Sequence, residues 1–191
     1  MRLFLAVPLP DTLTGDVARA CAIARASVPG VRWVSAAHMH LTMKFLGERP
    51  DHDPSRIADV SRAAMTSVMP FHATLGGVGA FPNFSRPRVV WLGMEPSAPF
   101  VSIAALLDRA LAPLGYPVES RPFTAHLTLG RVDHRPGRPQ RAALVDALLH
   151  AFGARSPHAP LHVRELALIR SDLARGAARY DTLHSIPLGV S

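Results

Sequence analysis

The 191-residue sequence contains one cysteine, one lysine and no long hydrophobic run. One cysteine cannot form an intrachain disulfide, so Cys21 is expected to be a buried apolar side chain in a protein of the reducing cytoplasm. No segment approaches the length of a membrane span, and a membrane is not an expected partner. Arg2 and the apolar residues after it look like the start of a signal peptide, but Pro8, Pro10 and Asp11 interrupt that pattern.

Basic residues outnumber acidic ones, and nearly all of them are arginine. The formal net charge is +7, and Lys44 is the only lysine among the 21 lysine and arginine residues. A positive balance favours polyanionic partners, and the planar guanidinium group donates paired hydrogen bonds to a phosphate. An arginine-rich and alanine-rich genome composition explains most of these arginines equally well, and the sequence leaves both explanations open.

A four-residue pattern occurs twice, as His40-Leu41-Thr42-Met43 and as His126-Leu127-Thr128-Leu129. Side chains two residues apart share one face of a β-strand, so each copy is predicted to place an imidazole beside a hydroxyl while its apolar residues enter a core. A lone histidine in a strand is usually a structural or surface residue. Repetition with threonine at the same offset favours a shared function, and it is the strongest functional signal in the sequence.

The two histidine–threonine pairs have the chemistry that a phosphodiester reaction needs. Histidines close to their ordinary pKa can divide the work of acid and base, and a threonine hydroxyl can donate to an anionic oxygen. Facing each other across a groove, the pairs would hold a phosphate undergoing in-line displacement. Arg131 follows Thr128 by three residues, so its side chain is predicted to leave the strand on the opposite face or at its end and to add a charged donor.

A metal site is the alternative for the first motif. His38 and His40 are spaced to share a strand face, as zinc ligands do. However, the second copy has Thr124 where His38 would recur, and it has no cysteine cluster or glutamate beside it. No metal and no cofactor are therefore expected. The remaining histidines lack a repeated context and are interpreted as surface or core residues.

The order of the expected elements favours an α+β fold. Helices are expected over Asp11–Ser27, Asp53–Met69 and Ala98–Leu114, and from the Asp133–Pro139 loop to Phe152. Besides the His40 strand, strands are expected over Arg2–Val7, Val31–Ser35, Phe71–Val78, Val89–Met94, Phe123–Arg131, Leu161–Arg170 and Tyr180–Leu188, with Tyr116–Ser120 resembling an edge strand. Several connections are too short for helical crossovers, so antiparallel pairs are needed. Each motif follows a helix and an edge-like strand, which predicts two similar lobes that face each other.

At this point the sequence resembles a known family, the 2H phosphoesterases, and within it the RNA 2′,3′-cyclic phosphodiesterases once called 2′-5′ RNA ligases. The resemblance covers nearly the whole chain. Its most specific part is the ungapped run from His40 to Glu48 with its Phe-Leu-Gly-Glu end. Further matching segments are Arg2–Phe4, Val31–Val34, Phe81-Pro82, Pro87–Trp91, Arg121–Phe123, His126–Arg131, Ser171–Leu173, Gly176–Tyr180 and Pro187-Leu188. Relatives often carry Asn in place of His38 and more commonly Ala in place of Gly130.

The resemblance implies a fold and a reaction. The fold is bilobal, with two antiparallel sheets that line a central groove and helices outside, and residues 1–191 form one two-lobed domain. The reaction is metal-free opening of a terminal 2′,3′-cyclic phosphate to a 2′-phosphate, with weak and reversible 2′-5′ ligation as a side activity. His40 is then the proton donor and His126 the acceptor, while Thr42, Thr128 and Arg131 hold the phosphate. RNA ends and nucleoside 2′,3′-cyclic phosphates are the expected partners of a monomeric protein.

Several alternatives stay open at the level of the sequence. Other 2H phosphoesterases act on different cyclic phosphates or on 2′-5′ oligonucleotides, and a non-catalytic module that binds RNA ends would keep the same groove. Phe81, Phe123 and Tyr180 can stack on a base, although core packing is the more common role of such residues. Arginines around the second motif are predicted to contact RNA phosphates, namely Arg131, Arg135, Arg138 and Arg141.

Overall fold

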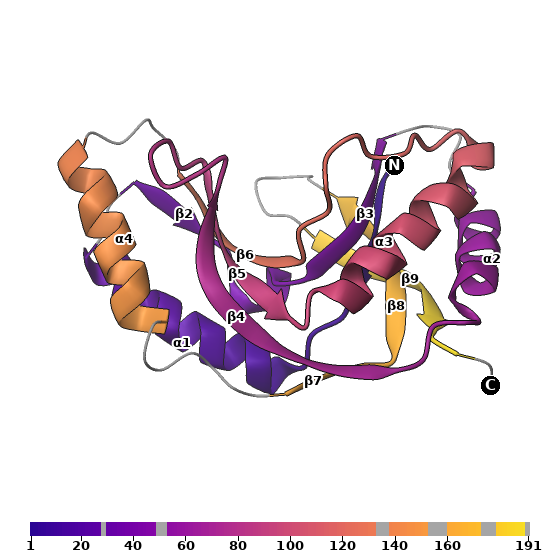
Figure 1. Ribbon diagram of the computed structural model, residues 1–191, viewed down its shortest axis with the longest axis horizontal. Coiled ribbons are helices and arrows are strands. Elements are labelled where there is room, and N and C mark those ends of the chain that lie inside the picture. Colours follow the sequence, from indigo (N-terminus) through magenta and orange to yellow (C-terminus); the bar gives the residue numbers. More distant parts are fainter. Residues whose placement is uncertain (28–29, 49–52, 133–137, 153–159, 173–178, 190–191) are drawn as a thin grey trace.

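Two antiparallel sheets form the framework of the protein (Figure 1). The computed structural model describes residues 1–27, 30–48, 53–132, 138–152, 160–172 and 179–189. The first sheet has the strand order β3-β1-β8-β9, with β3 at Leu41–Glu48, β1 at Arg2–Val7, β8 at Glu165–Asp172 and β9 at Arg179–Pro187. The second has the order β2-β6-β5-β4-β7, with β2 at Val31–Trp33, β6 at His126–Val132, β5 at Val89–Glu95, β4 at Phe71–Phe81 and β7 at Leu161–Val163.

The helices lie in two pairs outside the sheets. Helices α1 (Asp11–Ser27) and α4 (Arg138–Phe152) pack against each other beside the second sheet, and α2 (Pro54–Met65) and α3 (Ala98–Leu111) pack together beside the first (Figure 1). The Asp53 carboxylate caps α2 by accepting from the Arg56 amide at 3.0 Å. None of the helices in the described ranges is both long enough and apolar enough to span a membrane.

The chain passes repeatedly between the two sheets, so one apolar core joins them. Strands β1 and β3 belong to the first sheet, whereas β2, between them in the chain, belongs to the second. Leu41 and Met43 of the first motif and Leu127 and Leu129 of the second all enter the same buried cluster. The expected α+β architecture, with two antiparallel sheets and outer helices, is therefore confirmed.

Some expected boundaries were wrong. Helix α2 ends at Met65 rather than Met69, and the expected Leu161–Arg170 strand is two strands in different sheets, divided at Arg164 where the chain crosses over. Strand β4 does not end at Val78 but continues to Phe81. Residue 79, inside this strand, is a glycine because the Trp91 ring fills the space that a side chain would need, only 2.2 Å from an ideal Cβ. Residues 133–137 of the expected loop, and Gly176, lie outside the described residues.

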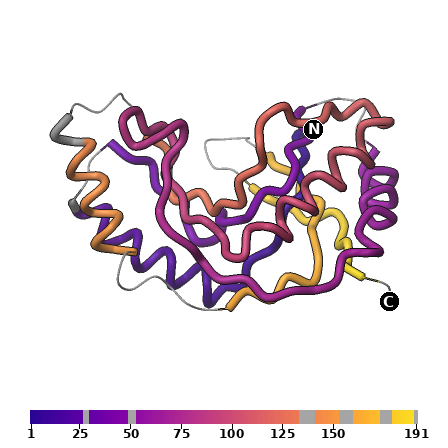
Figure 2. Tube along the Cα trace, in the orientation of Figure 1, coloured from indigo at the N-terminus to yellow at the C-terminus, as the bar shows by residue number. Residues whose placement is uncertain are grey.

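The segment that precedes the second motif connects helix α3, beside the first sheet, to strand β6 of the second sheet. Residues 115–125, called the strap below, run from the end of α3 past the first sheet and then down to β6 (Figure 2). Gly115 begins the strap with φ of 82°, a backbone conformation that favours glycine. Tyr116–Ser120 does not form the predicted edge strand. The predicted start of β6 at Phe123 is also wrong, because β6 begins at His126.

Candidate active site

The two motif histidines are held by the same local contact. Nδ1 of His40 lies 2.9 Å from the His38 carbonyl oxygen, and Nδ1 of His126 lies 2.7 Å from the Thr124 carbonyl oxygen. A carbonyl oxygen only accepts hydrogen bonds, so Nδ1 carries the proton in both rings and donates it two residues back. Nε2 of each imidazole is therefore the nitrogen left to exchange a proton with a substrate.

Burial and neighbouring charges set the proton affinity of the pair. Burial is the main cause that lowers the pKa of both imidazoles, and the carbonyl contacts raise it again in part. The charges of His38 and His126 lower the pKa of His40 further, and the charge of Arg131 lowers that of His126. Strands β3 and β6 are in contact. Because the imidazoles repel each other when charged, the pair holds one proton more readily than two.

Aromatic rings enclose each histidine. The His40 ring lies 5.1 Å from Tyr180, edge-on at 86°, and 4.6 Å from Phe4. The His126 ring lies 4.9 Å from Phe81, edge-on at 88°, and 5.9 Å from Trp91. Two of the three aromatic residues predicted to stack on a base therefore pack against the imidazoles themselves. This contact holds the rings in place, and the sequence analysis did not foresee it.

The two motif strands share an irregularity directly after the threonine. On β3, Ala6 of β1 pairs with Thr42 and the preceding Leu5 pairs with Lys44, so Met43 is an extra residue. On β6, Trp91 of β5 pairs with Thr128 and the preceding Val90 pairs with Gly130, so Leu129 is extra in the same way. Such a β-bulge shifts the alternation of side chains by one residue.

The bulge changes the expected position of Arg131. An odd spacing from Thr128 predicted the opposite strand face, but the extra Leu129 returns Arg131 to the face of His126 and Thr128. The exposed Arg131 guanidinium is close enough to lower the pKa of His126. Of the two predicted placements, the opposite face is therefore wrong, whereas the strand end is correct, because Arg131 is the second-last residue of β6. Its proximity to His126 is consistent with the expected role at the phosphate.

By the same parity, Phe45 is the counterpart of Arg131 in the first motif. Both follow the motif threonine by three residues across a bulge, and both are exposed, with 47% of Phe45 accessible. The Phe45 ring lies in contact with the Arg2 guanidinium, 4.9 Å from the ring centroid. The alternation of the sequence does not indicate Phe45 as a residue of the groove, because a strand without a bulge would place it on the face opposite Thr42.

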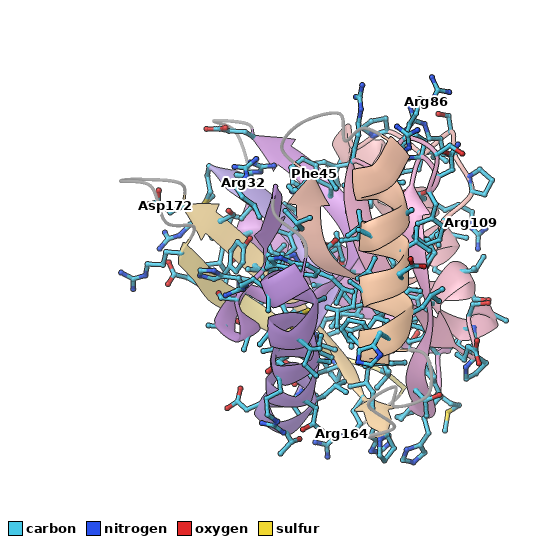
Figure 3. The ribbon with its side chains drawn as sticks, turned by 90° about the vertical axis from the view of Figure 1, so that its left-hand side faces the viewer. Arg32, Phe45, Arg86, Arg109, Arg164 and Asp172 are labelled. Carbon is cyan, nitrogen blue, oxygen red and sulfur yellow. The ribbon has the colours of Figure 1, made fainter. Side chains whose placement is uncertain are left out.

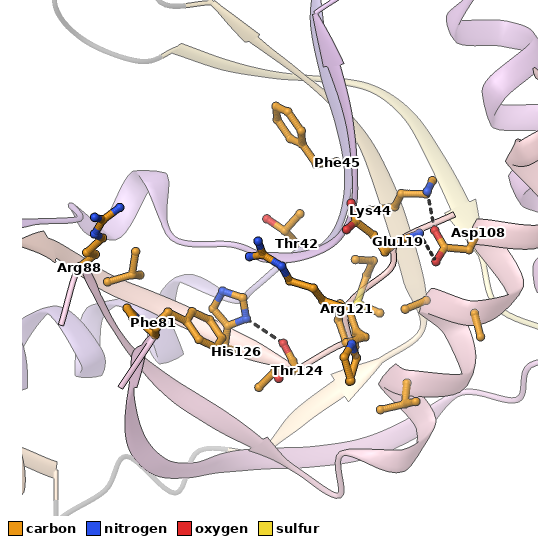
Figure 4. A pocket seen from close by; sticks show the side chains of 18 of the residues that line it. Thr42, Lys44, Phe45, Phe81, Arg88, Asp108, Glu119, Arg121, Thr124 and His126 are labelled. Carbon is orange, nitrogen blue, oxygen red and sulfur yellow. Dashed lines mark hydrogen bonds and ion pairs between the residues drawn. The ribbon is translucent and has the colours of Figure 1, made fainter. Parts of the chain in front are cut away.

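A groove of about 1630 Å³ opens beside these motifs (Figure 4). Thr42, Phe45, Phe81 and His126 contribute to its wall. Further wall residues come from β3, β5, the end of β6, α3, the strap, the loop after Phe81 and the start of α4, and include Phe123, Thr124, Asp108, Arg86, Arg88, Arg109, Arg121 and Arg141. Of the arginines predicted to contact RNA around the second motif, Arg141 lines this groove. Arg135 and the side chain of Arg138 lie outside the described parts of the chain.

The metal alternative finds no support among the described side chains. No group of three histidine, cysteine, aspartate or glutamate residues within them is arranged to hold an ion. His38 instead has its Nδ1 3.0 Å from the Ser35 hydroxyl and packs edge-on against Tyr180, 5.2 Å between ring centroids.

Comparison with known proteins identifies the family. The family model of the 2′-5′ RNA ligase superfamily matches residues 11–175 of this chain. The RNA 2′,3′-cyclic phosphodiesterase of Methanothermobacter thermautotrophicus is 32% identical over 94% of this chain and 95% of its own. The Thermus thermophilus protein of the same name is 33% identical over 98% of this chain and 90% of its own.

Solved structures agree with the sequence relatives. The crystal structure of TT0787 from Thermus thermophilus superposes with a TM-score of 0.77 at 29% identity and covers 98% of both chains. Escherichia coli LigT in complex with 3′-AMP superposes with a TM-score of 0.73 at 28% identity, over 98% of this chain and 97% of its own. With two opposed histidine–threonine strands of the same local geometry and relatives along nearly its whole length, the chain belongs to the 2′-5′ RNA ligase superfamily of the 2H phosphoesterases.

Proposed function

We propose that this protein is an RNA 2′,3′-cyclic phosphodiesterase, which opens a terminal 2′,3′-cyclic phosphate to a 2′-phosphate without a metal. The observation that carries the proposal is the repeated orientation of His40 and His126, whose Nδ1 atoms both donate to the carbonyl two residues back and leave Nε2 for chemistry. The curated relatives with that activity in their names support the choice of substrate.

In the proposed reaction His126 is the base and His40 the acid. Neutral His126 removes a proton from water through Nε2, and the oxygen of that water attacks phosphorus. The bond from phosphorus to O3′ breaks on the opposite side, and His40 donates its proton to O3′, which leaves a free 3′-hydroxyl and a 2′-phosphate. The Arg131 charge favours neutral His126, since it lowers the pKa of that imidazole. A bound phosphate anion favours the protonated form of His40.

The phosphate oxygens need donors on both sides of the groove. Thr42 and Thr128 are half-buried on opposite strands and offer hydroxyl donors, while Arg131 offers the charged one. Donors that are already in place stabilise the charge that develops on the equatorial oxygens during displacement. If a 5′-hydroxyl replaces the attacking water, the same groups join two strands through a 2′-5′ linkage, so weak reversible ligation accompanies the proposed activity.

The proposal includes the setting of the reaction. The protein works as a monomer in the cytoplasm on RNA ends or on nucleoside 2′,3′-cyclic phosphates. The buried free thiol of Cys21 supports a reducing compartment. The choice of RNA as the substrate polymer is supported by the names of the curated relatives, which are RNA 2′,3′-cyclic phosphodiesterases.

Turnover of 2′,3′-cyclic AMP tests the proposal. The expected product is 2′-AMP, separated by chromatography from a 3′-AMP standard. His40→Ala and His126→Ala are each expected to lower kcat by about 10²–10⁴-fold, the range for one positioned acid or base. Because both act in one step, the double variant should be less impaired than the product of the single effects. Binding of the nucleotide without hydrolysis would point instead to a non-catalytic module, and a predominant 3′-AMP product would reverse the assigned leaving oxygen.

A further inference from the structure

The groove continues well beyond the reacting phosphate. From Thr42 and His126 its wall extends along the strap to α3 and along the loop that follows Phe81. At about 1630 Å³ it exceeds the roughly 300–1,000 Å³ of a typical small-molecule pocket. A mononucleotide would leave part of this space open, so the groove has room for a longer substrate.

The charges in this extension favour an anion. Among the described residues, its wall contains the arginines 86, 88, 109, 121 and 141 and two carboxylates, Asp108 and Glu119. The Asp108 carboxylate is paired with Lys44. Arg86 and Arg109 project on the same side of the molecule (Figure 3). Such a surplus of positive charge in a groove attracts phosphate groups more strongly than uncharged bases.

Arg121 reaches from the strap toward the two motifs. Its side chain extends from the strap across the groove, and its guanidinium group points toward Thr42 and His126 (Figure 4). Arg121 is exposed, and no carboxylate among the described residues forms an ion pair with it. Its guanidinium donors are therefore available to an anionic ligand. In the sequence, Arg121 belongs to a segment that matches the family, and no role for it is predicted from that match.

The strap that carries Arg121 is held by hydrogen bonds to side chains of β3 and α3. The buried Lys44 ammonium pairs with Asp108 of α3 and donates to the Pro117 carbonyl oxygen at 2.8 Å. The second carboxylate oxygen of Asp108 accepts from the Glu119 amide at 3.2 Å. Strand β3, helix α3 and the strap are thus joined two residues before Arg121. A guanidinium group on an anchored backbone loses less entropy when it binds a ligand.

We propose that Arg121 binds the phosphate on the 5′ side of the terminal nucleotide, and so makes the site select an RNA end over an isolated cyclic nucleotide. This inference rests on the proposed function, because it assumes that the cyclic phosphate lies between the two motifs. The terminal ribose then has its cyclic phosphate at the histidines, and the next negative charge along the strand is its 5′-phosphate. Among the side chains labelled in Figure 4, Arg121 is a cation that points toward His126 and Thr42 and that the proposed reaction does not use.

Two nucleotides that differ by one phosphate test the inference. The substrates are adenosine 2′,3′-cyclic phosphate with and without a 5′-phosphate, and the measured quantity is the ratio of their kcat/KM values. A charge-assisted hydrogen bond predicts a wild-type preference of about 10-fold to 100-fold for the 5′-phosphorylated compound. Arg121→Gln is expected to remove most of that preference. A ratio that is unchanged in Arg121→Gln would overturn the inference, as would a wild-type enzyme without any preference.

Two other arginines supply matched controls. Arg131→Gln should lower kcat/KM for both compounds and leave the ratio in place, because Arg131 is assigned to the reacting phosphate. Arg164→Gln, at an exposed position between β7 and β8 and away from the groove, should change neither value (Figure 3). If Arg121→Gln instead behaves like Arg131→Gln, Arg121 acts on the reacting phosphate and the proposed subsite is wrong.

A binding measurement separates this inference from the proposed function. Calorimetric titration with adenosine 2′,5′-bisphosphate and with 2′-AMP requires no turnover. Tighter binding of the bisphosphate, lost in Arg121→Gln, would support the subsite even if neither cyclic compound is hydrolysed, an outcome that would refute only the proposed activity. Equal affinities for the two ligands in the wild-type protein would refute the subsite, whatever the turnover assay shows.

Discussion

Replacing Lys44 with methionine is expected to destabilise the protein strongly. The Lys44 side chain is 3% exposed and the Asp108 side chain is 15% exposed. Methionine keeps the length and the apolar stem of lysine but removes the ammonium group, so the Asp108 carboxylate is left without its cation. Loss of one partner from a buried ion pair costs about 3–5 kcal/mol, since the other charge stays buried and unpaired. Lys44→Met also removes the donor to the Pro117 carbonyl, but Pro117 is exposed, so water can replace that hydrogen bond. Because Asp108 keeps its contact with the Glu119 amide, the expected cost lies near the lower limit, at about 3 kcal/mol.

Urea unfolding followed by circular dichroism measures this cost. A loss of about 3 kcal/mol is a large part of the roughly 5–15 kcal/mol that stabilises a typical domain, and it should lower the midpoint of thermal unfolding by about 6–12 °C in a chain of this size. Arg62→Met is the matched control because its pair with Asp59 is exposed, and it should cost less than about 1 kcal/mol. The double variant Lys44→Met/Asp108→Leu should be more stable than Lys44→Met, because it leaves no unpaired charge, although the Pro117 carbonyl and the Glu119 amide both lose their partners. A Lys44→Met cost as small as that of Arg62→Met, or a double variant as unstable as the single one, would refute the reasoning.

Two further predictions concern the surroundings of the histidines. In His126→Gln the pKa of His40 should rise toward its ordinary value, because the charge of His126 no longer lowers it, although burial still does. An NMR titration of the His40 ring measures this pKa. An unchanged or lower value would show that the two imidazoles do not interact. Gly79→Ala should cost about 1–3 kcal/mol and reduce turnover, because an ideal Cβ at Gly79 lies 2.2 Å from the Trp91 ring, which packs in turn near His126. Denaturant unfolding and turnover of 2′,3′-cyclic AMP check it, and wild-type values in both would mean that the Trp91 ring moves aside freely.

The repeated motif could be predicted from the sequence because its information is local. Alternation of apolar and polar residues is a property of one strand, and it correctly placed Leu41 and Leu127 in the core. The face of Arg131 could not be predicted in the same way. It depends on the bulge at Leu129, which is a property of how β6 pairs with β5 and leaves no mark in the alternation before it.

The strap shows a second limit of prediction from sequence. Tyr116–Ser120 was expected to form an edge strand, which would satisfy its backbone through a neighbouring strand. Two of its backbone groups are satisfied by side chains instead, with the Pro117 carbonyl accepting from Lys44 and the Glu119 amide donating to Asp108. These partners lie far away in the sequence, so neither composition nor periodicity indicates them. For the same reason the sequence did not single out Arg121, whose position depends on that anchoring.

The scarcity of reactive side chains makes the groove accessible to site-specific labelling. Cys21 is buried in α1, and burial raises the pKa of its thiol to about 12, so it stays protonated and unreactive toward maleimides at neutral pH. A cysteine introduced at Ser120 on the strap, or at Ser85 on the facing loop, would then be the reactive thiol of the protein; both positions are exposed. A pair of spectroscopic probes at these two sites would report the width of the groove in solution, with the native cysteine left in place.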